Sequence, residues 1–179
     1  MSTPTQPQLH MRRELVGLPD LSIPSGYALR PLQPRDVDRW ADLLARNAEL
    51  GTWDYERAAP YFAPGAPMIL DGSFFVTLEE QPVATAQLHV HRDDSYAPIP
   101  ELGWVAVVPE QQGRGLGYIV CLAVLQHAQS QRFSRIFLRT DDHRLPAIKT
   151  YLKLGFQPWI RDPETQERWV HVLDRLNLK

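Results

Sequence analysis

The sequence has one cysteine and no long apolar segment. Cys121 allows no internal disulfide and offers no cysteine cluster for zinc, which is typical of proteins from a reducing compartment. No stretch approaches the roughly 18 consecutive apolar residues of a membrane helix. Residues 1–24 also lack the apolar centre of a signal peptide. We therefore expect a cytoplasmic protein.

The sequence also lacks an excess of charge of either sign. The chain carries 19 Lys+Arg and 21 Asp+Glu, so its formal net charge is −2. This balance gives no electrostatic reason to expect nucleic acid or a membrane surface as a partner. The 179 residues are 44% apolar and 22% charged, which suits one compact domain with a sizeable core.

Proline marks the first boundary that we expect in the chain. Four prolines among polar residues disfavour a long regular element over residues 1–24, so we predict an N-terminal tail there and one domain over residues 25–179. Within that domain, apolar spacing predicts alternating strands and helices. The expected elements are a strand from Tyr27, a helix over Val37–Leu44, mostly loop over 51–72, strands at Ser73–Leu78 and Val83–His91, a loop at Asp93–Pro100, a strand at Glu101–Val108, a helix at Gly117–Ser130, a strand at Ile136–Arg139, a helix at Pro146–Leu154, and strands near Phe156–Ile160 and Arg168–Leu173.

A glycine-rich loop between a buried strand and a helix is the strongest chemical signal. Gly113, Gly115 and Gly117 lie where Val105–Val108 ends and the helix begins. Glycine lets backbone N–H groups turn inward and approach a ligand closely, and a helix N-terminus adds partial positive charge. Arg114 adds a full charge. The loop therefore predicts a pyrophosphate site, with a tight packing turn as the alternative interpretation.

Two common nucleotide motifs do not fit this loop. A P-loop needs Lys followed by Ser or Thr after its glycines, and none is present. A dinucleotide-binding fold needs G-x-G-x-x-G inside a strand–helix–strand unit, whereas this loop reads G-x-G-x-G after antiparallel strands.

Two segments together resemble the GCN5-related N-acetyltransferase (GNAT) superfamily. Gln112-Gly113-Arg114-Gly115-Leu116-Gly117 matches Q/R-x-x-G-x-G/A, and Ala147–Phe156 resembles A-x-x-x-Y-x-K-x-G-F at the usual distance downstream. The resemblance implies an α/β (α+β) fold: a central mixed, mostly antiparallel twisted sheet of about seven strands flanked by helices. A splayed pair of parallel strands would hold acyl-CoA.

The resemblance also implies a cofactor and the groups that bind it. Acetyl-CoA would pair its pantetheine amides with the backbone of Val105, Ala106 and Val107. Its pyrophosphate would lie against the N–H groups of the loop and first helical turn. The loop residues carried over are Gln112, Gly113, Arg114, Gly115, Leu116, Gly117 and Tyr118.

The implied reaction moves an acetyl group to an amine, which requires an acid and a base. Tyr151 matches the family's general acid, and its phenol is a proton donor at neutral pH; packing of its helix is the alternative role. Glu101 matches a position where several members hold a glutamate that acts as the base. A solvated carboxylate at the end of a strand, with no chemical role, is the equal alternative. His89 and His91 compete with it as bases, and without further ligands they make a weak metal site, so we expect no metal.

One position departs from the family pattern. The asparagine usually found seven residues before the tyrosine is replaced by Arg144. Its guanidinium could bind a CoA phosphate or cap exposed backbone. Asp141, Asp142 or His143 could take over the positioning role instead.

The acceptor is expected between the first helical region and the last strands. Trp53, Tyr55 and His89 are our candidates for binding it, and Asp54 or Glu56 could attract a cationic amine. The other aromatics of these segments are core or acceptor-binding residues: Tyr61, Phe62, Trp159 and Trp169. We expect a small-molecule amine as partner. Another acyl-CoA, a protein N-terminus or lysine, a non-catalytic acyl-CoA sensor and a homodimer stay open.

Overall fold

The structure, a computed structural model, describes residues 7–91 and 98–178. Its centre is one seven-stranded sheet in the order β2-β3-β4-β5-β6-β1-β7. Neighbouring strands are antiparallel except β5 and β6, which are parallel, so the predicted mixed, mostly antiparallel sheet is confirmed. The strands are β1 (Leu9–Glu14), β2 (Tyr27–Pro31), β3 (Met68–Leu78), β4 (Gln81–His91), β5 (Ile99–Val107), β6 (Arg135–Thr140) and β7 (Gln157–Pro158).

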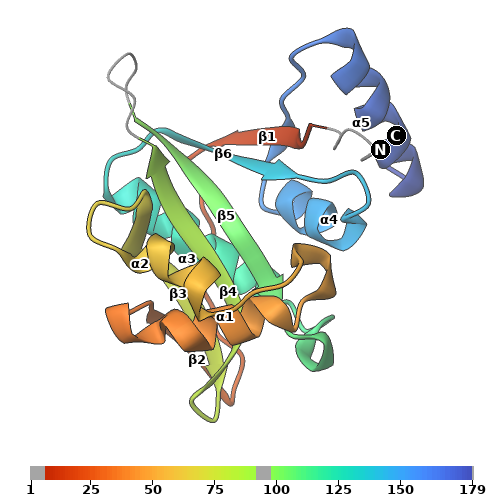
Figure 1. Cartoon of the computed structure of the whole chain (residues 1–179). Coiled ribbons are helices and arrows are strands. Elements are labelled where there is room, and N and C mark those ends of the chain that lie inside the picture. The colour runs from red at the N-terminus through yellow and green to blue at the C-terminus, as the bar shows by residue number, and fades with distance from the viewer. Residues whose placement is uncertain (1–6, 92–97, 179) are drawn as a thin grey trace.

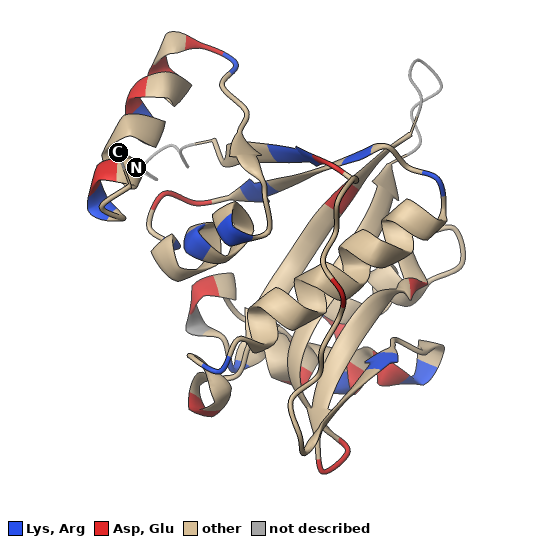
Figure 2. Ribbon diagram, turned by 180° about the vertical axis from the view of Figure 1, so that it is seen from behind, with Lys and Arg blue, Asp and Glu red and all other residues tan. Residues whose placement is uncertain are grey.

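Helices cover both faces of this sheet. Helices α1 and α2 lie on the face turned toward the viewer in Figure 1, and α3 crosses the opposite face, seen in Figure 2. Helix α4 packs against α3. The helices are α1 (Val37–Ala45), α2 (Tyr55–Phe62), α3 (Leu116–Ser130), α4 (Leu145–Lys153) and α5 (Pro163–Arg175), with short 3-10 helices η1 (Pro34–Asp36), η2 (Ala48–Leu50) and η3 (Pro109–Gln111).

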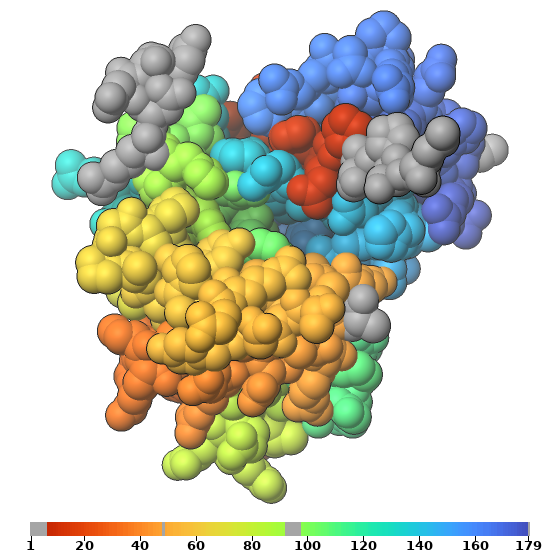
Figure 3. Space-filling model, viewed as in Figure 1, coloured from red at the N-terminus to blue at the C-terminus, as the bar shows by residue number. Residues whose placement is uncertain are grey.

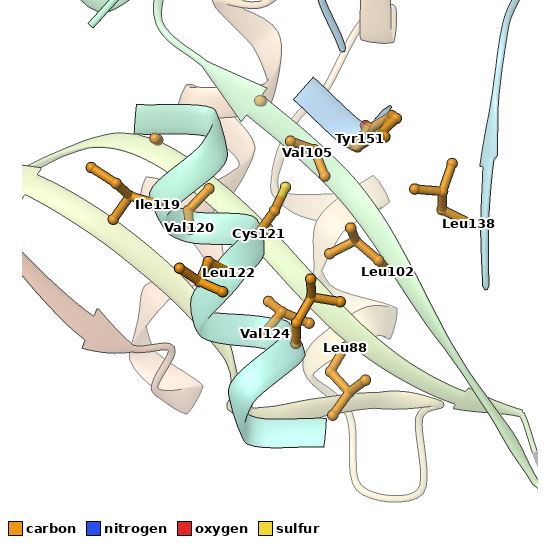
Figure 4. Packing of buried hydrophobic residues seen from close by; sticks show 14 of the residues in the cluster. Leu88, Leu102, Val105, Ile119, Val120, Cys121, Leu122, Val124, Leu138 and Tyr151 are labelled. Carbon is orange, nitrogen blue, oxygen red and sulfur yellow. The ribbon is translucent and has the colours of Figure 1, made fainter. Parts of the chain in front are cut away.

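The core forms where α3 meets β3, β4 and β5. This helix carries no charged residue and is buried on most of its circumference, as expected for an element enclosed by others. Figure 4 shows its side chains among those of the sheet, with Cys121 pointing toward Val105 and Tyr151. Among the described residues, no helix combines the length and apolar character needed to cross a membrane.

Strand β1 differs from what the sequence predicts. It lies within the predicted tail and pairs with β6 on one side and β7 on the other. Leu9 and Met11 are fully buried and alternate with His10 and Arg12, so the period of two is present but extends over only six residues. A loop is predicted at Asp93–Pro100. Its positions 93–97 lie outside the described residues, and Ile99 and Pro100 belong to β5.

The predicted strand at Arg168–Leu173 is wrong, because these residues belong to α5. The Asp162 side chain accepts a hydrogen bond from the backbone N–H of Thr165 at 2.7 Å, and Pro163 occupies the first turn. Trp169 and Val172, three residues apart, are the buried side chains. Spacing by three places both on one helical face, whereas Val170 is exposed.

Candidate active site

The gap between β5 and β6 lies at the centre of the site. These parallel strands pair only at Glu101 with Phe137 and at Leu102 with Leu138. Beyond Leu102, β5 continues to pair with β4 while β6 separates from it. One edge of β5 therefore has backbone groups that no neighbouring strand occupies.

Only part of the predicted Val105–Val107 backbone faces this gap. The N–H and C=O of one strand residue point to the same side, and successive residues alternate. The Val105 carbonyl accepts a hydrogen bond from Arg144 Nη2 at 3.1 Å, and the Val107 carbonyl accepts one from Gln112 Nε2 at 3.3 Å. Both residues thus face the gap, while Ala106, which pairs with Thr85, faces β4.

A bulge in β5 precedes this edge. Trp104 and Val105 together oppose the single residue Ala86 of β4, and Trp104 has a φ of 46°, a left-handed conformation that is rare for a bulky side chain. The bulge turns the Trp104 ring toward α1 and α2. No sequence pattern indicated this conformation.

The glycine-rich loop has the geometry that a pyrophosphate site requires. Gly113 and Gly115 have φ values of 75° and 78°, and Gly115 is the N-cap of α3. A Cβ built on either residue meets no atom within 4 Å, so the space beside the loop is open. Arg114 is exposed there, and the first-turn N–H groups at Leu116 to Tyr118 have no partner within their own helix.

Gly117 differs from the other two glycines of the loop. A Cβ at this position would lie 3.5 Å from Val107 Cγ2, an ordinary van der Waals contact, so packing of α3 on β5 does not itself require glycine here. The residues of the loop therefore fit the phosphate part of acetyl-CoA.

Tyr151 lies in α4 and is 2% exposed. Its helix ends in a Schellman motif, in which the Phe156 N–H donates to the Tyr151 carbonyl at 3.0 Å and the Gly155 N–H to Leu152 at 2.9 Å. Burial raises the pKa of Tyr151, with the neighbouring Cys121 adding to the effect. The phenol therefore stays protonated at neutral pH. Figure 4 shows it beside Val105, at the edge of the gap.

Arg144 spans the gap rather than facing solvent. It is the N-cap residue of α4 and is 8% exposed. Besides the Val105 carbonyl, its guanidinium contacts the Glu49 carboxylate at 3.2 Å, which links α4 to the segment after α1. Of the three neighbours that we considered, Asp142 is bound to Arg168, Asp141 accepts from Gln8, and His143 is exposed.

Glu101 lies at the closed end of the gap with its carboxylate buried. Arg139 Nε contacts Oε1 at 2.7 Å and Arg139 Nη2 contacts Oε2 at 3.1 Å. His91 Nε2 lies 2.8 Å from the same Oε2. The His91 side chain is 49% exposed, so it connects this buried carboxylate to solvent. Arg139 was not among the residues singled out from the sequence.

His89 is buried beside Tyr61, with ring centroids 6.1 Å apart. Burial lowers its pKa to about 4, against an opposing effect of Glu101. Its ring is therefore neutral at pH 7. Among the described residues, its Nε2 has no hydrogen-bond partner.

Half of the aromatics considered for the acceptor belong to one cluster around Trp40, namely Trp53, Tyr61 and Phe62. Trp53 is 5% exposed and lies 4.7 Å from Trp104 and 5.1 Å from Trp40 between ring centroids. Tyr55 is 51% exposed and outside these contacts, and Trp169 is a buried residue of α5. The Asp54 carboxylate caps α2 by accepting from the Arg57 N–H at 2.9 Å. The structure brings Trp53 and His89 to one side of β5 through Tyr61, but not Tyr55.

These residues surround a hollow in the surface. Figure 3 shows it with β5 at the bottom, the segment from η2 to α2 on one side, and β1 and β6 on the other. Lys and Arg gather on β1 and β6 (Figure 2).

The family comparison matches the site and its surroundings. A family model described as "Acetyltransferase (GNAT) family" matches residues 37–156. This range includes the glycine-rich loop, the β5–β6 gap and the whole of α4.

Proteins with similar sequences include mycothiol acetyltransferases. A mycothiol acetyltransferase of Thermobispora bispora is 31% identical over 166 residues, covering 85% of this chain and 54% of the relative. One of Nocardia farcinica is 33% identical over 165 residues, covering 83% and 52%. The chain thus spans about half the length of the curated relatives that it matches.

Solved structures share the fold. A GCN5-related N-acetyltransferase from Sphaerobacter thermophilus superimposes with a TM-score of 0.67 at 15% identity, covering 86% of this chain and 50% of the other. The ribosomal-protein-S18-alanine N-acetyltransferase of Escherichia coli gives a TM-score of 0.62 at 21% identity, covering 75% and 79%.

Proposed function

Because the chain belongs to the acetyltransferase (GNAT) family, we propose that it transfers the acetyl group of acetyl-CoA to the primary amine of a small molecule. The observation that carries this proposal is the juxtaposition of three features along β5: the open glycine-rich loop, the unpaired strand edge, and the protonated Tyr151 beside that edge. The relatives named for mycothiol support a small-molecule acceptor over a protein.

The chain's own residues would hold acetyl-CoA along this edge. The N–H groups at the start of α3 and Arg114 would bind its phosphates, and the Val105 and Val107 backbone would bind its arm. Arg144 already occupies the Val105 carbonyl, so we place Arg144 beside the arm, in the position of the asparagine that the family often has. When bound, acetyl-CoA would supply the acetyl group, activated as a thioester, for attack by the amine.

Proton movement is assigned to two side chains. An amine attacks only without its extra proton, and Glu101 accepts that proton directly or through water. Arg139 fixes the orientation of the carboxylate, and His91 gives the proton a path to solvent. Tyr151 holds its proton at Oη and donates it to the departing sulfur.

Release of free thiol from acetyl-CoA, measured over a panel of amines, tests the activity. Tyr151→Phe keeps the ring and should lower kcat by about 10²–10⁴ while leaving the KM for acetyl-CoA unchanged. Wild-type turnover in this variant, under conditions where chemistry limits the rate, would leave Tyr151 a packing role only. Binding of acetyl-CoA without thiol release for any amine would favour a non-catalytic acyl-CoA sensor. Repeating the assay with a panel of other acyl-CoA compounds tests whether another acyl group is transferred.

The base has a separate test. Glu101→Gln should lower kcat/KM and leave acetyl-CoA binding intact. If a protein base accepts the proton, kcat/KM should rise with pH as that base loses its own proton. His89→Phe should leave this rise in place, because a ring with a pKa of about 4 is not the group that titrates near neutrality. A rise that follows the pKa of the acceptor and ignores Glu101→Gln and His91→Gln would mean that no protein base is needed.

A further inference from the structure

Two arginines meet on one indole at the rim of the hollow. Trp159 follows β7, and its backbone N–H donates to the His10 carbonyl at 2.8 Å. The guanidinium carbons of Arg12 and Arg161 lie 5.6 and 5.5 Å from the centroid of its ring. The centroid of the Trp159 ring lies 6.4 Å from that of Phe137, which fixes the indole on the sheet. Because both guanidiniums lie against this indole, the two arginines are held at a defined place.

Neither arginine forms a direct ion pair within the described residues. Arg161 contributes, after hydrogen bonds from Thr165, to a lowered pKa of the exposed Asp162, so its charge is only partly balanced. The adjacent Asp162 accepts from the Thr165 N–H and caps α5, and Glu101 is shared by Arg139 and His91. Burial, and then the nearby Arg161, lower the pKa of His10, which disfavours its charged form.

The arginine pair shares a sheet face with the catalytic carboxylate. In the register, Phe137 is paired with both Arg12 of β1 and Glu101 of β5, and paired residues point to the same face. Arg12 and Glu101 are thus separated by two strand spacings, which is about 10 Å. A molecule in the hollow can reach both.

We propose that Arg12 and Arg161 on Trp159 form a subsite for an anionic group of the acceptor, a phosphate or a carboxylate. This rests on the proposed function, since it places the acceptor amine at Glu101. Guanidiniums bind both groups through paired N–H donors. The separation selects an amine whose anion lies several bonds away, and it excludes an α-amino acid, whose carboxylate is too near its nitrogen. The two guanidinium charges would repel a polycationic acceptor.

Matched acceptors test the charge and the distance. Glucosamine 6-phosphate is compared with glucosamine, and 6-aminohexanoate with hexylamine, while glycine provides a short carboxylate. We expect kcat/KM to favour the anionic member of at least one pair by about tenfold or more, with no such gain for glycine. The pair that responds identifies phosphate or carboxylate. The preference should shrink between about 0.01 M and about 0.1 M salt, as the Debye length falls from about 30 to about 10 Å.

Variants assign the preference to residues. Arg12→Gln and Arg161→Gln should each reduce the preference, and the double variant should abolish it without changing the rate with the acceptor that lacks the anionic group. Arg35→Gln, an exposed arginine of η1, removes the same charge elsewhere and should change nothing. Equal rates for both members of each pair, or an equal loss in the control, would overturn the subsite.

Binding separates this proposal from the proposed function. Titration calorimetry with the same acceptors in the absence of acetyl-CoA reports affinity without turnover. Tighter binding of an anionic member, lost in the double variant, with no thiol release would support the subsite and refute the acetyltransferase activity. Thiol release without any charge preference in rate or affinity would refute the subsite alone.

Discussion

His89 makes the stability of the protein depend on pH in a calculable direction. The side chain is 5% exposed, and burial lowers its pKa from 6.5 to about 4. The unfolded chain therefore binds a proton below about pH 6.5 that the folded protein does not bind until about pH 4. Stability is fully present above pH 6.5, is lost as the pH falls toward 4, and changes no further below that.

The magnitude follows from the shift. Each pKa unit corresponds to about 1.4 kcal/mol, so the loss that His89 causes is about 3 kcal/mol. Urea denaturation at about pH 7.5 and about pH 4 gives the free energy of unfolding at each. His89→Phe keeps a planar ring beside Tyr61 and removes the titration.

The variant isolates the effect of one residue. Any packing cost of the larger ring applies at both pH values and cancels in the difference between them. We expect the wild type to lose about 3 kcal/mol more than His89→Phe between the two conditions. An equal loss in both proteins would refute the argument that His89 is buried in its neutral form.

Three further substitutions, one of them with a matched control, test other parts of the structure. Gly115→Ala should destabilise the protein by about 1 kcal/mol, because an L side chain disfavours a φ of 78°, and should weaken acetyl-CoA binding in calorimetry; Gly117→Ala, at a negative φ within α3, should not destabilise it. Gly155→Ala should cost about 1–2 kcal/mol in denaturation, since its φ is 83° in the Schellman motif of α4. Asp36→Ala should cost about 3 kcal/mol at pH 7, because it leaves Arg30 without its buried partner at 2.6 Å.

Much of the fold could be predicted because its signals are local. The helix predicted over Val37–Leu44, the hairpin predicted at Ser73–Leu78 and Val83–His91, and the loop leading into α3 each have their pattern within a few residues. The segment 51–72, predicted as mostly loop, instead holds α2 and the beginning of β3. Strand β1 and helix α5 were predicted wrongly, as a tail and as a strand. Leu9 and Met11 alternate over too short a segment, and Val170 with Val172 imitates a strand, although Asp162 and Pro163 signal a helix start.

The site could be predicted only where its residues belong to a motif. The glycines and Tyr151 lie in such motifs. Arg139 meets Glu101 across two parallel strands 38 positions apart in sequence, and no periodicity reveals that contact. Trp104 enters the aromatic cluster through a bulge with a positive φ, which propensity argues against.

The place of β1 between β6 and β7 has a consequence for synthesis of the chain. Glu14 leaves the ribosome long before its partner Arg135, and Pro158 follows later still. At a rate of about 5–20 residues per second, β1 waits roughly ten seconds with both edges unpaired. Closing so large a loop is slow, although its length adds little to the equilibrium cost. Strand β1 therefore joins the sheet only after β6 has been synthesised, so its pairing is a late step of folding.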